Sequence, residues 1–339
     1  MKRTVTATTP GKVVLCGEYA VLHGAPAVCM AVDRHVEVTA VPADDDCLVL
    51  AAPGYREGRW RFRTEGARIR WLDALPAANC FRLFELLWTR FAPPGQWALT
   101  IDSTPFVDAA SGRKLGLGAS AATAVAVGGV LAALGGDGGD EAARVAAAHR
   151  DYQGGRGSGV DVACCRHGGV IEYRMHRPRA PGALAWPAGL ARRFLWSGVA
   201  ASTVDKLRAF GTEGRGARRS RPLAALARQA AVVAACWRRH DSDGLLEALP
   251  GYVCALRALD VDRSLGIFDA GHARLADMAP DRGVAYKPCG AGGGDVGVVF
   301  ARTEAAAAAF AEEATRFGFR NVELSMADRG MTLVDTPGQ

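Results

Sequence analysis

The sequence lacks the features that would indicate a membrane protein, a disulfide-rich scaffold or a structural zinc site. The uncharged apolar run Ala121–Leu134 is shorter than the about 20 residues that a bilayer-spanning helix needs. Residues 1–10 are polar and lack the apolar core of a secretory signal peptide. The nine cysteines include no Cys-x-x-Cys pair with zinc spacing, and their odd number in apolar segments favours reduced thiols. We therefore expect a soluble, cytoplasmic protein with no membrane partner.

The chain also lacks a strong charge of either sign. Its 41 lysines and arginines against 35 aspartates and glutamates give a net charge of +6 over 339 residues, which is modest for nucleic-acid binding. Basic residues cluster between Arg215 and Arg221 among glycines, where a solvated linker and an anion-handling lid are equally good interpretations. We expect a small anionic partner and no nucleic acid.

The length of the chain and the alternation of predicted strands and helices predict the fold class and the number of domains. A chain of 339 residues with 49% hydrophobic residues fits two closely packed domains. Alternating or β-branched runs predict strands at 5–7, 13–16, 27–41, 48–52, 60–63, 97–102, 170–173, 194–196 and 331–334. Periodic apolar faces predict helices at 79–91, 121–134, 141–152, 223–237, 245–259, 264–278 and 304–317. This alternation predicts an α+β fold, and the Pro- and Gly-rich segment 177–189 suggests a crossing between domains 1–185 and 186–339.

One glycine-rich segment, Lys114–Ala122, leads directly into the apolar run that follows it. Such a junction presents unpaired backbone N–H groups and the positive end of a helix dipole, so it attracts a phosphate. Ser120 would lie in the first turn, where its hydroxyl can cap the helix, contact a phosphate or bind a metal ion. The segment also matches a dinucleotide-binding fingerprint, but no strand and acidic residue follow at the required spacing.

Three other candidate site residues also have simpler structural interpretations. Lys12 opens a predicted strand, where a lysine is usually solvated, and it cannot belong to a Walker A loop because Val13 follows it. Asp161 follows the glycine-rich segment 154–159 and begins an apolar segment, where a helix N-cap is the default interpretation. His149 fits a helix surface or core, since no second histidine stands at metal-binding spacing.

Three glycine-containing motifs lie in order at Pro10–Gly24, Gly116–Ala122 and Gly290–Asp295. Together they resemble the motifs of the GHMP kinase superfamily, which includes galactokinases, homoserine kinases, mevalonate kinases and phosphomevalonate kinases. Within the superfamily the chain is most similar to the phosphomevalonate kinases, through residues 101–103, 157–163, 196–203 and 285–288. The resemblance implies a two-domain fold, with an N-terminal α+β domain and a C-terminal ferredoxin-like domain. It also implies ATP and Mg²⁺ as cofactors, with nucleotide and substrate in the cleft between the domains.

The resemblance implies roles for particular residues. Lys12 and Asp161 would form the catalytic pair, and Ser120 would also contact the metal ion. Nucleotide binding would fall to Lys114, Gly116, Leu117, Gly118, Ala119, Ser120 and Ala121. Substrate binding would fall to His23, Ser158, Gly159, Ser202, Lys287, Cys289, Gly290, Ala291, Gly292 and Gly293.

The chain departs from the usual motifs at three positions. Ala119 and Cys289 stand where serine is usual, and Arg150 stands where mevalonate kinases have a glutamate that helps to bind magnesium. An acceptor phosphate is already ionised at neutral pH, so cations near it matter more than a base. The candidate cations are Lys12, Arg156, Lys287 and the loop arginines between Arg215 and Arg221.

The resemblance therefore implies ATP-dependent phosphorylation of 5-phosphomevalonate to 5-diphosphomevalonate in the mevalonate pathway of isoprenoid biosynthesis. One alternative is a mevalonate kinase or another kinase of the same superfamily acting on a small alcohol, with Asp161 as base. Another is a sensor that keeps the fold and binds nucleotide without turnover. The expected state is a monomer or homodimer.

Overall fold

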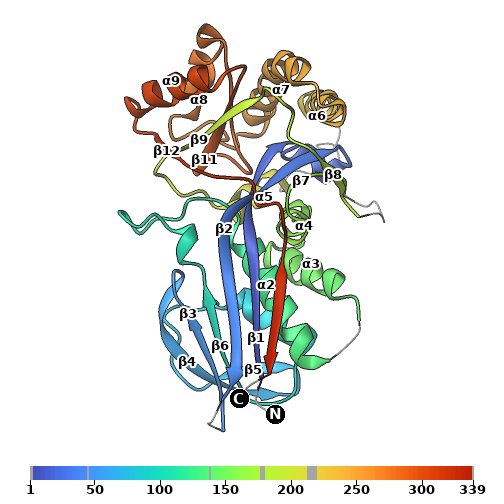
Figure 1. Ribbon diagram of the computed structural model, residues 1–339, viewed down its shortest axis with the longest axis vertical. Helices are drawn as coiled ribbons and strands as arrows, with labels where there is room; N and C mark the ends of the chain where they lie inside the picture. Colours follow the sequence, from blue (N-terminus) through green and yellow to red (C-terminus); the bar gives the residue numbers. More distant parts are fainter. Residues whose placement is uncertain (1–2, 44–45, 137–138, 176–179, 212–219, 338–339) are drawn as a thin grey trace.

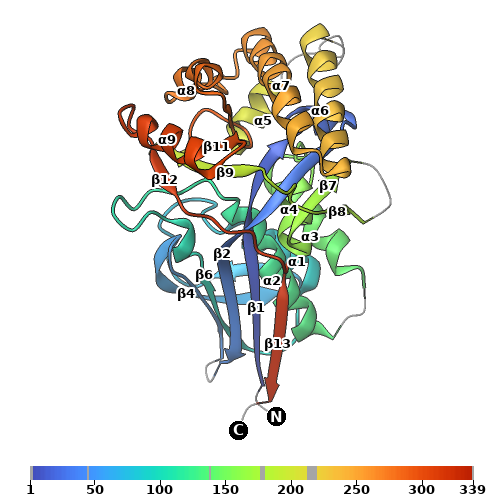
Figure 2. The ribbon, with the colours of Figure 1, turned by 45° about the horizontal axis from the view of Figure 1, so that its top comes forward.

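The computed structural model describes residues 3–43, 46–136, 139–175, 180–211 and 220–337. Figure 1 shows two parts: a large sheet with α2 to α4 in the lower part, and a smaller sheet with α6 to α9 in the upper part; Figure 2 shows α1 beside α2. Two sheets with helices packed on them confirm the expected α+β class. Among the residues described, none of the helices has the length and apolar character needed to cross a membrane.

The large sheet is organised around two long strands, β1 (Arg3–Cys16) and β2 (Ala27–Pro42). Its main path runs β13-β1-β2-β6-β3-β4-β5. The strand β7 pairs with the first residues of β2, Ala27–Met30, and β8 pairs with β7. The remaining strands of this sheet are β3 (Leu48–Ala52), β4 (Arg56–Glu65), β5 (Arg68–Trp71), β6 (Trp97–Asp102), β7 (Val170–Tyr173), β8 (Gly182–Leu184) and β13 (Thr332–Pro337).

The sequence predicts two short strands at 5–7 and 13–16, separated by Pro10 and Gly11, but the structure has no break there. The strand runs on through both residues, and its pairing with β2 shifts in register between them. A bulge of this kind absorbs a proline, which has no N–H for the ladder, without ending the strand. The expectation of two short strands was therefore wrong. Lys12 lies within the continuous strand, at the boundary between the two parts.

The helix α2 (Ala119–Gly135) forms the centre of the lower part. It is apolar on all sides, as expected for a fully buried helix, and it packs on β1, β2, α1, α3 and α4. Its neighbours are α1 (Arg82–Phe91), α3 (Glu141–Tyr152) and α4 (Val160–His167). This packing holds the N-terminus of α2 close to the start of α4.

The upper part contains an antiparallel sheet in the order β10-β11-β9-β12. Its strands are β9 (Ala191–Trp196), β10 (Ala285–Pro288), β11 (Val296–Ala301) and β12 (Arg320–Val322), and its helices are α5 (Thr203–Gly211), α6 (Arg221–Arg239), α7 (Ser242–Arg263), α8 (His272–Met278) and α9 (Glu304–Thr315). The helix expected at 264–278 begins only at His272, because Ser264, Gly266 and Ala270 adopt positive φ angles and form a turn.

The chain returns to the large sheet after the upper part. The strand β13 pairs antiparallel with the first half of β1, and Figure 2 shows it beside β1. Residues 186–339 therefore contribute to both sheets. The boundary at residue 185 stays a prediction, and the strand pairing adds that the second segment also completes an edge of the first sheet.

Candidate active site

The glycine loop is attached directly to β1. The N–H of Lys12 donates to the carbonyl of Leu117 at 2.8 Å, and Gly118 is the N-cap of α2 with a φ of 80°. A Cβ at Gly118 would lie 2.6 Å from Cε of Lys12, so the lysine side chain passes over the loop where only a glycine leaves room. The loop and the lysine are thus built as one unit at the N-terminus of α2.

Lys12 forms an ion pair with Asp161. Its Nζ lies 3.4 Å from Oδ1 of Asp161, with 9% of the lysine side chain and 21% of the aspartate side chain exposed. Burial alone would lower the pKa of Lys12, but the charge and hydrogen bond of Asp161, together with smaller contributions from its other neighbours, raise that pKa above its usual value, so the ammonium form is favoured. Asp161 lies inside the first turn of α4, and Gly159 is the N-cap. The structure therefore supports neither a solvated Lys12 nor Asp161 as the N-cap.

The pair faces a hollow between the two parts of the molecule, here called the interdomain hollow. Its lower wall comes from β1, the turn Gly17–Leu22, the end of α3 and the segment Gly157–Asp161. Thr203 and Leu207 of α5, with Gly290 and Ala291, complete it from the upper part. Of the predicted substrate residues, Ser158, Gly159, Gly290 and Ala291 line this hollow. It encloses about 610 Å³, including space open to solvent.

A second hollow of about 710 Å³, here called the aromatic hollow, lies against the first turn of α2. Its lining includes five aromatic side chains, Tyr55, Phe81, Phe84, Phe106 and Tyr152. Lys114, Ala119 and Ser120, three of the predicted nucleotide residues, line it as well. The Nζ of Lys114 lies 5.1 Å from the centre of the Tyr55 ring. The N-terminus of α2 therefore separates an aromatic hollow from a hollow that holds an ion pair.

His149 connects the two hollows through Ser120. Its Nε2 lies 3.2 Å from Oγ of Ser120, and its side chain lines the interdomain hollow although only 1% of the residue is exposed. Burial lowers the pKa of His149 to about 4, so its ring is neutral at neutral pH. The sequence interpretation of a surface or core histidine accounts for its burial but missed its place beside Ser120.

Replacing His149 with glutamine is expected to lower kcat about 10-fold, because the Ser120 hydroxyl loses the partner that orients it. Ser120→Ala is expected to produce a similar loss, and the double variant should lose little more than either single variant. Steady-state kinetics on the three variants tests this coupling. His167→Gln, at the exposed end of α4, is the matched control. Losses that multiply in the double variant would show that the two side chains act independently.

The loop of the second motif also contacts the third motif. A Cβ at Gly116 would lie 2.2 Å from the Cβ and Cγ of Asp295. Oδ1 of Asp295 accepts a hydrogen bond from the N–H of Ala201 at 3.1 Å, and burial raises the pKa of this carboxyl to about 6. The third motif therefore packs against the predicted phosphate loop.

The other predicted substrate residues lie around the interdomain hollow. Gly292 and Gly293 pack against the turn at Gly266 and Ile267. Ser202 accepts a hydrogen bond through its Oγ from the N–H of Asp205 at the start of α5. His23 is exposed, and its ring packs edge-on against Phe210 of α5. The site roles of these residues stay predictions.

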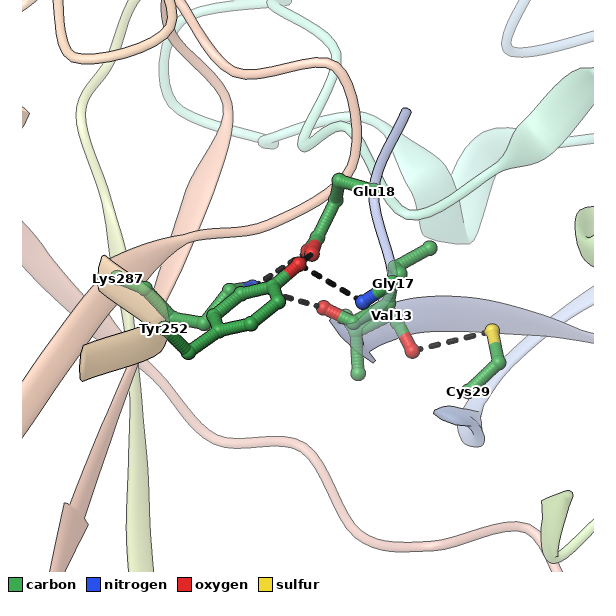
Figure 3. Close-up of polar contacts among 7 residues, drawn as sticks. Val13, Gly17, Glu18, Cys29, Tyr252 and Lys287 are labelled. Atoms are coloured by element: carbon green, nitrogen blue, oxygen red, sulfur yellow. Dashed lines mark hydrogen bonds and ion pairs between the residues drawn. The ribbon is translucent and has the colours of Figure 1, made fainter. Parts of the chain in front are cut away.

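Lys287 and Cys289 are buried behind the wall of the hollow. Lys287 has no exposed surface, and its Nζ lies 2.5 Å from Oε1 of Glu18. Cys289 is 9% exposed, and its N–H donates to the carbonyl of Val296. Glu18 itself lines the hollow, and its other oxygen accepts a hydrogen bond from Tyr252 (Figure 3). Glu18 stands in the first motif, but nothing in the sequence around Tyr252 indicated that the two would meet.

The charges around the interdomain hollow are few in the part of the chain that the structure describes. Lys12 is the cation in its lining, with Glu18 and Asp161 as the carboxylates. Arg156 lies next to Gly211 at the end of α5. Of the basic cluster, Arg221 begins α6, and residues 212–219 lie outside the described residues.

The protein side chains here suit a metal ion that is bound mainly by the phosphate oxygens of a bound ligand. Across the described ranges, no three His, Cys, Asp or Glu side chains are grouped so that they could hold a metal ion. Mg²⁺ usually keeps several waters and is bound through one or two protein oxygens together with phosphate oxygens. The hydroxyl of Ser120 beside the N-terminus of α2 fits such a site.

Similarity to known proteins agrees with this geometry, although no protein-family model matches the chain. A phosphomevalonate kinase from Streptomyces sp. (strain CL190) is 31% identical over 350 residues, which cover 90% of this chain and 91% of the relative. The Lin0012 protein from Listeria innocua has a similar structure, with a TM-score of 0.80 and 22% identity over 99% of this chain and 100% of that one. Phosphomevalonate kinase from Streptococcus pneumoniae, solved with phosphomevalonate and AMPPNP, has a TM-score of 0.73 and 17% identity over 95% of this chain and 99% of that one. The shared fold, the order of the motifs and this identity over nearly the full length show that the chain belongs to the GHMP kinase superfamily of phosphotransferases.

Proposed function

We propose that this kinase transfers the γ-phosphoryl group of ATP to the phosphate of 5-phosphomevalonate, giving 5-diphosphomevalonate and ADP. The observation that carries the proposal is the buried Lys12–Asp161 pair, which lies between the N-terminus of α2 and the interdomain hollow. A cation at this junction would neutralise charge where the two phosphates meet. The name of the 31% identical relative from Streptomyces supports the choice of acceptor.

In this proposal the nucleotide lies across the start of α2. The purine occupies the aromatic hollow, where Tyr55, Phe81 and Phe106 provide apolar surface. The phosphates lie over the loop from Gly116 to Ser120, whose free backbone N–H groups and helix dipole favour negative charge. Mg²⁺ would be held by the Ser120 hydroxyl and the nucleotide phosphates, and it would neutralise charge that develops on the β- and γ-phosphate oxygens.

The acceptor would lie in the interdomain hollow. Much of its lining is aliphatic, with Val14, Val21, Leu22, Val160 and Leu207, which suits a branched carbon chain better than a sugar ring with many hydroxyls. The acceptor phosphate needs no base, because its second pKa is about 6. Lys12 would bring the two anions together, and Asp161 would keep Lys12 charged and correctly placed.

A kinase that acts on mevalonate or another small alcohol is the second candidate. The same ion pair favours it, because Asp161 lies beside Lys12 and could take a proton from a hydroxyl. The sensor alternative is weaker, because Lys12, Ser120 and Asp161 are all present and close to one another around the helix start.

The purified protein should release ADP from ATP and Mg²⁺ with 5-phosphomevalonate and give at least 100-fold lower kcat/KM with mevalonate. The expected ratio corresponds to about 2.7 kcal/mol of discrimination by charge at the acceptor site. A coupled ADP assay with each acceptor offered separately measures it. Turnover with mevalonate alone would establish the alcohol kinase, and nucleotide binding without turnover on either compound would favour the sensor.

A further inference from the structure

The carboxylate of Glu18 lines the interdomain hollow, yet both of its oxygens are already bound. Oε1 lies 2.5 Å from Nζ of Lys287, and Oε2 accepts a hydrogen bond from Oη of Tyr252 at 2.5 Å. The three residues are 4%, 0% and 0% exposed, respectively. Burial alone would lower the pKa of Lys287, but Glu18 and smaller contributions from neighbouring groups together raise that pKa, so the ammonium form of Lys287 is favoured. A carboxylate held in this way is neither a free base nor an open metal ligand.

The two partners of Glu18 also bind the backbone that leads to it (Figure 3). Lys287 donates to the carbonyl of Val14 at 3.3 Å, and Oη of Tyr252 accepts from the N–H of Gly17 at 2.8 Å. Tyr252 lies on α7 and Lys287 on β10, so both side chains reach from the upper part to the segment just after Lys12. Two side chains of the upper part thereby fix the wall Val14–Glu18 of the lower part.

The residue that follows is held in an uncommon conformation. Tyr19 has a φ of 59°, which is rare for a residue with a side chain, and it also lines the interdomain hollow. Its Oη donates to the carbonyl of Ala291 at 2.7 Å, on the opposite wall. Backbone strain of this kind persists only where surrounding contacts hold it. The bonds to Val14, Gly17 and Glu18 are contacts of that kind.

We propose that Glu18, Lys287 and Tyr252 form a clamp that sets the affinity of the interdomain hollow for the phosphoryl acceptor without touching the acceptor. This inference rests on the proposed kinase function and assigns Lys287 a role different from the one that the resemblance implied. A buried, paired lysine does not serve as a direct cation for the acceptor. It removes the repulsion that an unpaired Glu18 would exert on an anionic acceptor, and it fixes the wall that Tyr19 continues.

The sharpest test removes one oxygen atom. Tyr252→Phe keeps the ring and deletes only the hydroxyl that binds Glu18 and Gly17. We expect the KM for the acceptor to rise about 10-fold, with the KM for ATP and kcat each within about threefold of the wild type. Tyr286→Phe is the matched control, because Tyr286 is also buried and its hydroxyl binds His272 at 2.7 Å on the side of β10 away from Lys287. Equal changes in both KM values, or equal effects of the two variants, would overturn the clamp.

A second set of variants separates the effect of the clamp on acceptor binding from its effect on the stability of the fold. Lys287→Met leaves the buried Glu18 carboxylate without its counterion and should lower the unfolding temperature. Combining it with Glu18→Gln removes both charges and the repulsion, and it should restore much of that temperature. The acceptor KM should still stay above the wild-type value, because the bond from Lys287 to the carbonyl of Val14 is missing. Recovery of the acceptor KM together with stability would show that the pair serves folding alone.

Acceptor assays on the wild-type protein test the proposed function separately from the clamp. If the wild type used mevalonate and not 5-phosphomevalonate, the proposed function would be wrong, and the KM ratio measured with mevalonate would still decide the clamp. If it used neither acceptor, both proposals would fall.

Discussion

Replacing Lys12 with methionine is expected to lower kcat by about 10³-fold while the protein remains folded. Methionine keeps most of the length of the side chain that passes over Gly118 but removes the ammonium that faces Asp161 and the hollow. The charge that two phosphate groups share during transfer would then lack its neutralising partner. Steady-state kinetics, with thermal unfolding of the same preparation, measures the effect.

Lys206→Met serves as the control for the loss of a partly buried ammonium. The Nζ of Lys206 binds the backbone carbonyls of Leu265 and Gly266, so this variant should lose stability but keep kcat within a few-fold. If Lys12→Met kept a tenth or more of the wild-type kcat, Lys12 would not lie at the reacting phosphates.

Replacing Asp161 with asparagine is expected to lower kcat by about 10²-fold and to make the remaining activity fall as pH rises. Burial lowers the pKa of Lys12, and in the wild type Asp161 makes the largest of the contributions that together outweigh burial. Without the carboxylate, the largest interaction that opposes burial is lost, and the pKa of Lys12 falls from its raised wild-type value. The variant would therefore lose its charged lysine on the alkaline side, where the wild type keeps it.

A pH–rate profile of Asp161→Asn between about pH 6 and 10 also separates the two acceptor types. With a phosphate acceptor, the remaining rate should fall with pH as Lys12 loses its proton. With an alcohol acceptor, the lost function would be that of a base, and a rising hydroxide concentration would raise the remaining rate. A KM for ATP that changed more than kcat would contradict both assignments, because it would place Asp161 at the nucleotide.

The sequence was sufficient to predict the fold class and the family, because both depend on local patterns. The periodicity of α2 and the glycines at its start can be read within a few residues, and they place Lys12 and Ser120 near a helix terminus. The same local reasoning failed at Pro10, where pairing with β2 outweighs the breaking tendency of proline and glycine. It failed again at 264–278, where an apolar pattern continues through a turn.

The hollows could not be predicted, because residues distant in sequence line them. Tyr55, Phe106 and Tyr152 come together only when β3, β6 and α3 are placed around α2. Tyr252 reaches Glu18 across 234 positions of sequence, so neither residue carries a local sign of the other. Lys287 was predicted to bind the substrate, and its pairing with Glu18 depends on packing that composition does not encode.

The pairing of β13 with β1 has a consequence for how the molecule is made. The ion pair between Arg3 and Asp335 joins residues 332 positions apart, and the strands on which they lie pair along residues 3–8. Contacts with such large sequence separation form late and slow the folding of a chain. Until residues 332–337 have been synthesised and have docked, the edge of β1 exposes unpaired N–H and C=O groups to which strands of other chains could add. The time a nascent chain spends in that state, more than the stability of the finished fold, would then determine how much of the protein escapes aggregation.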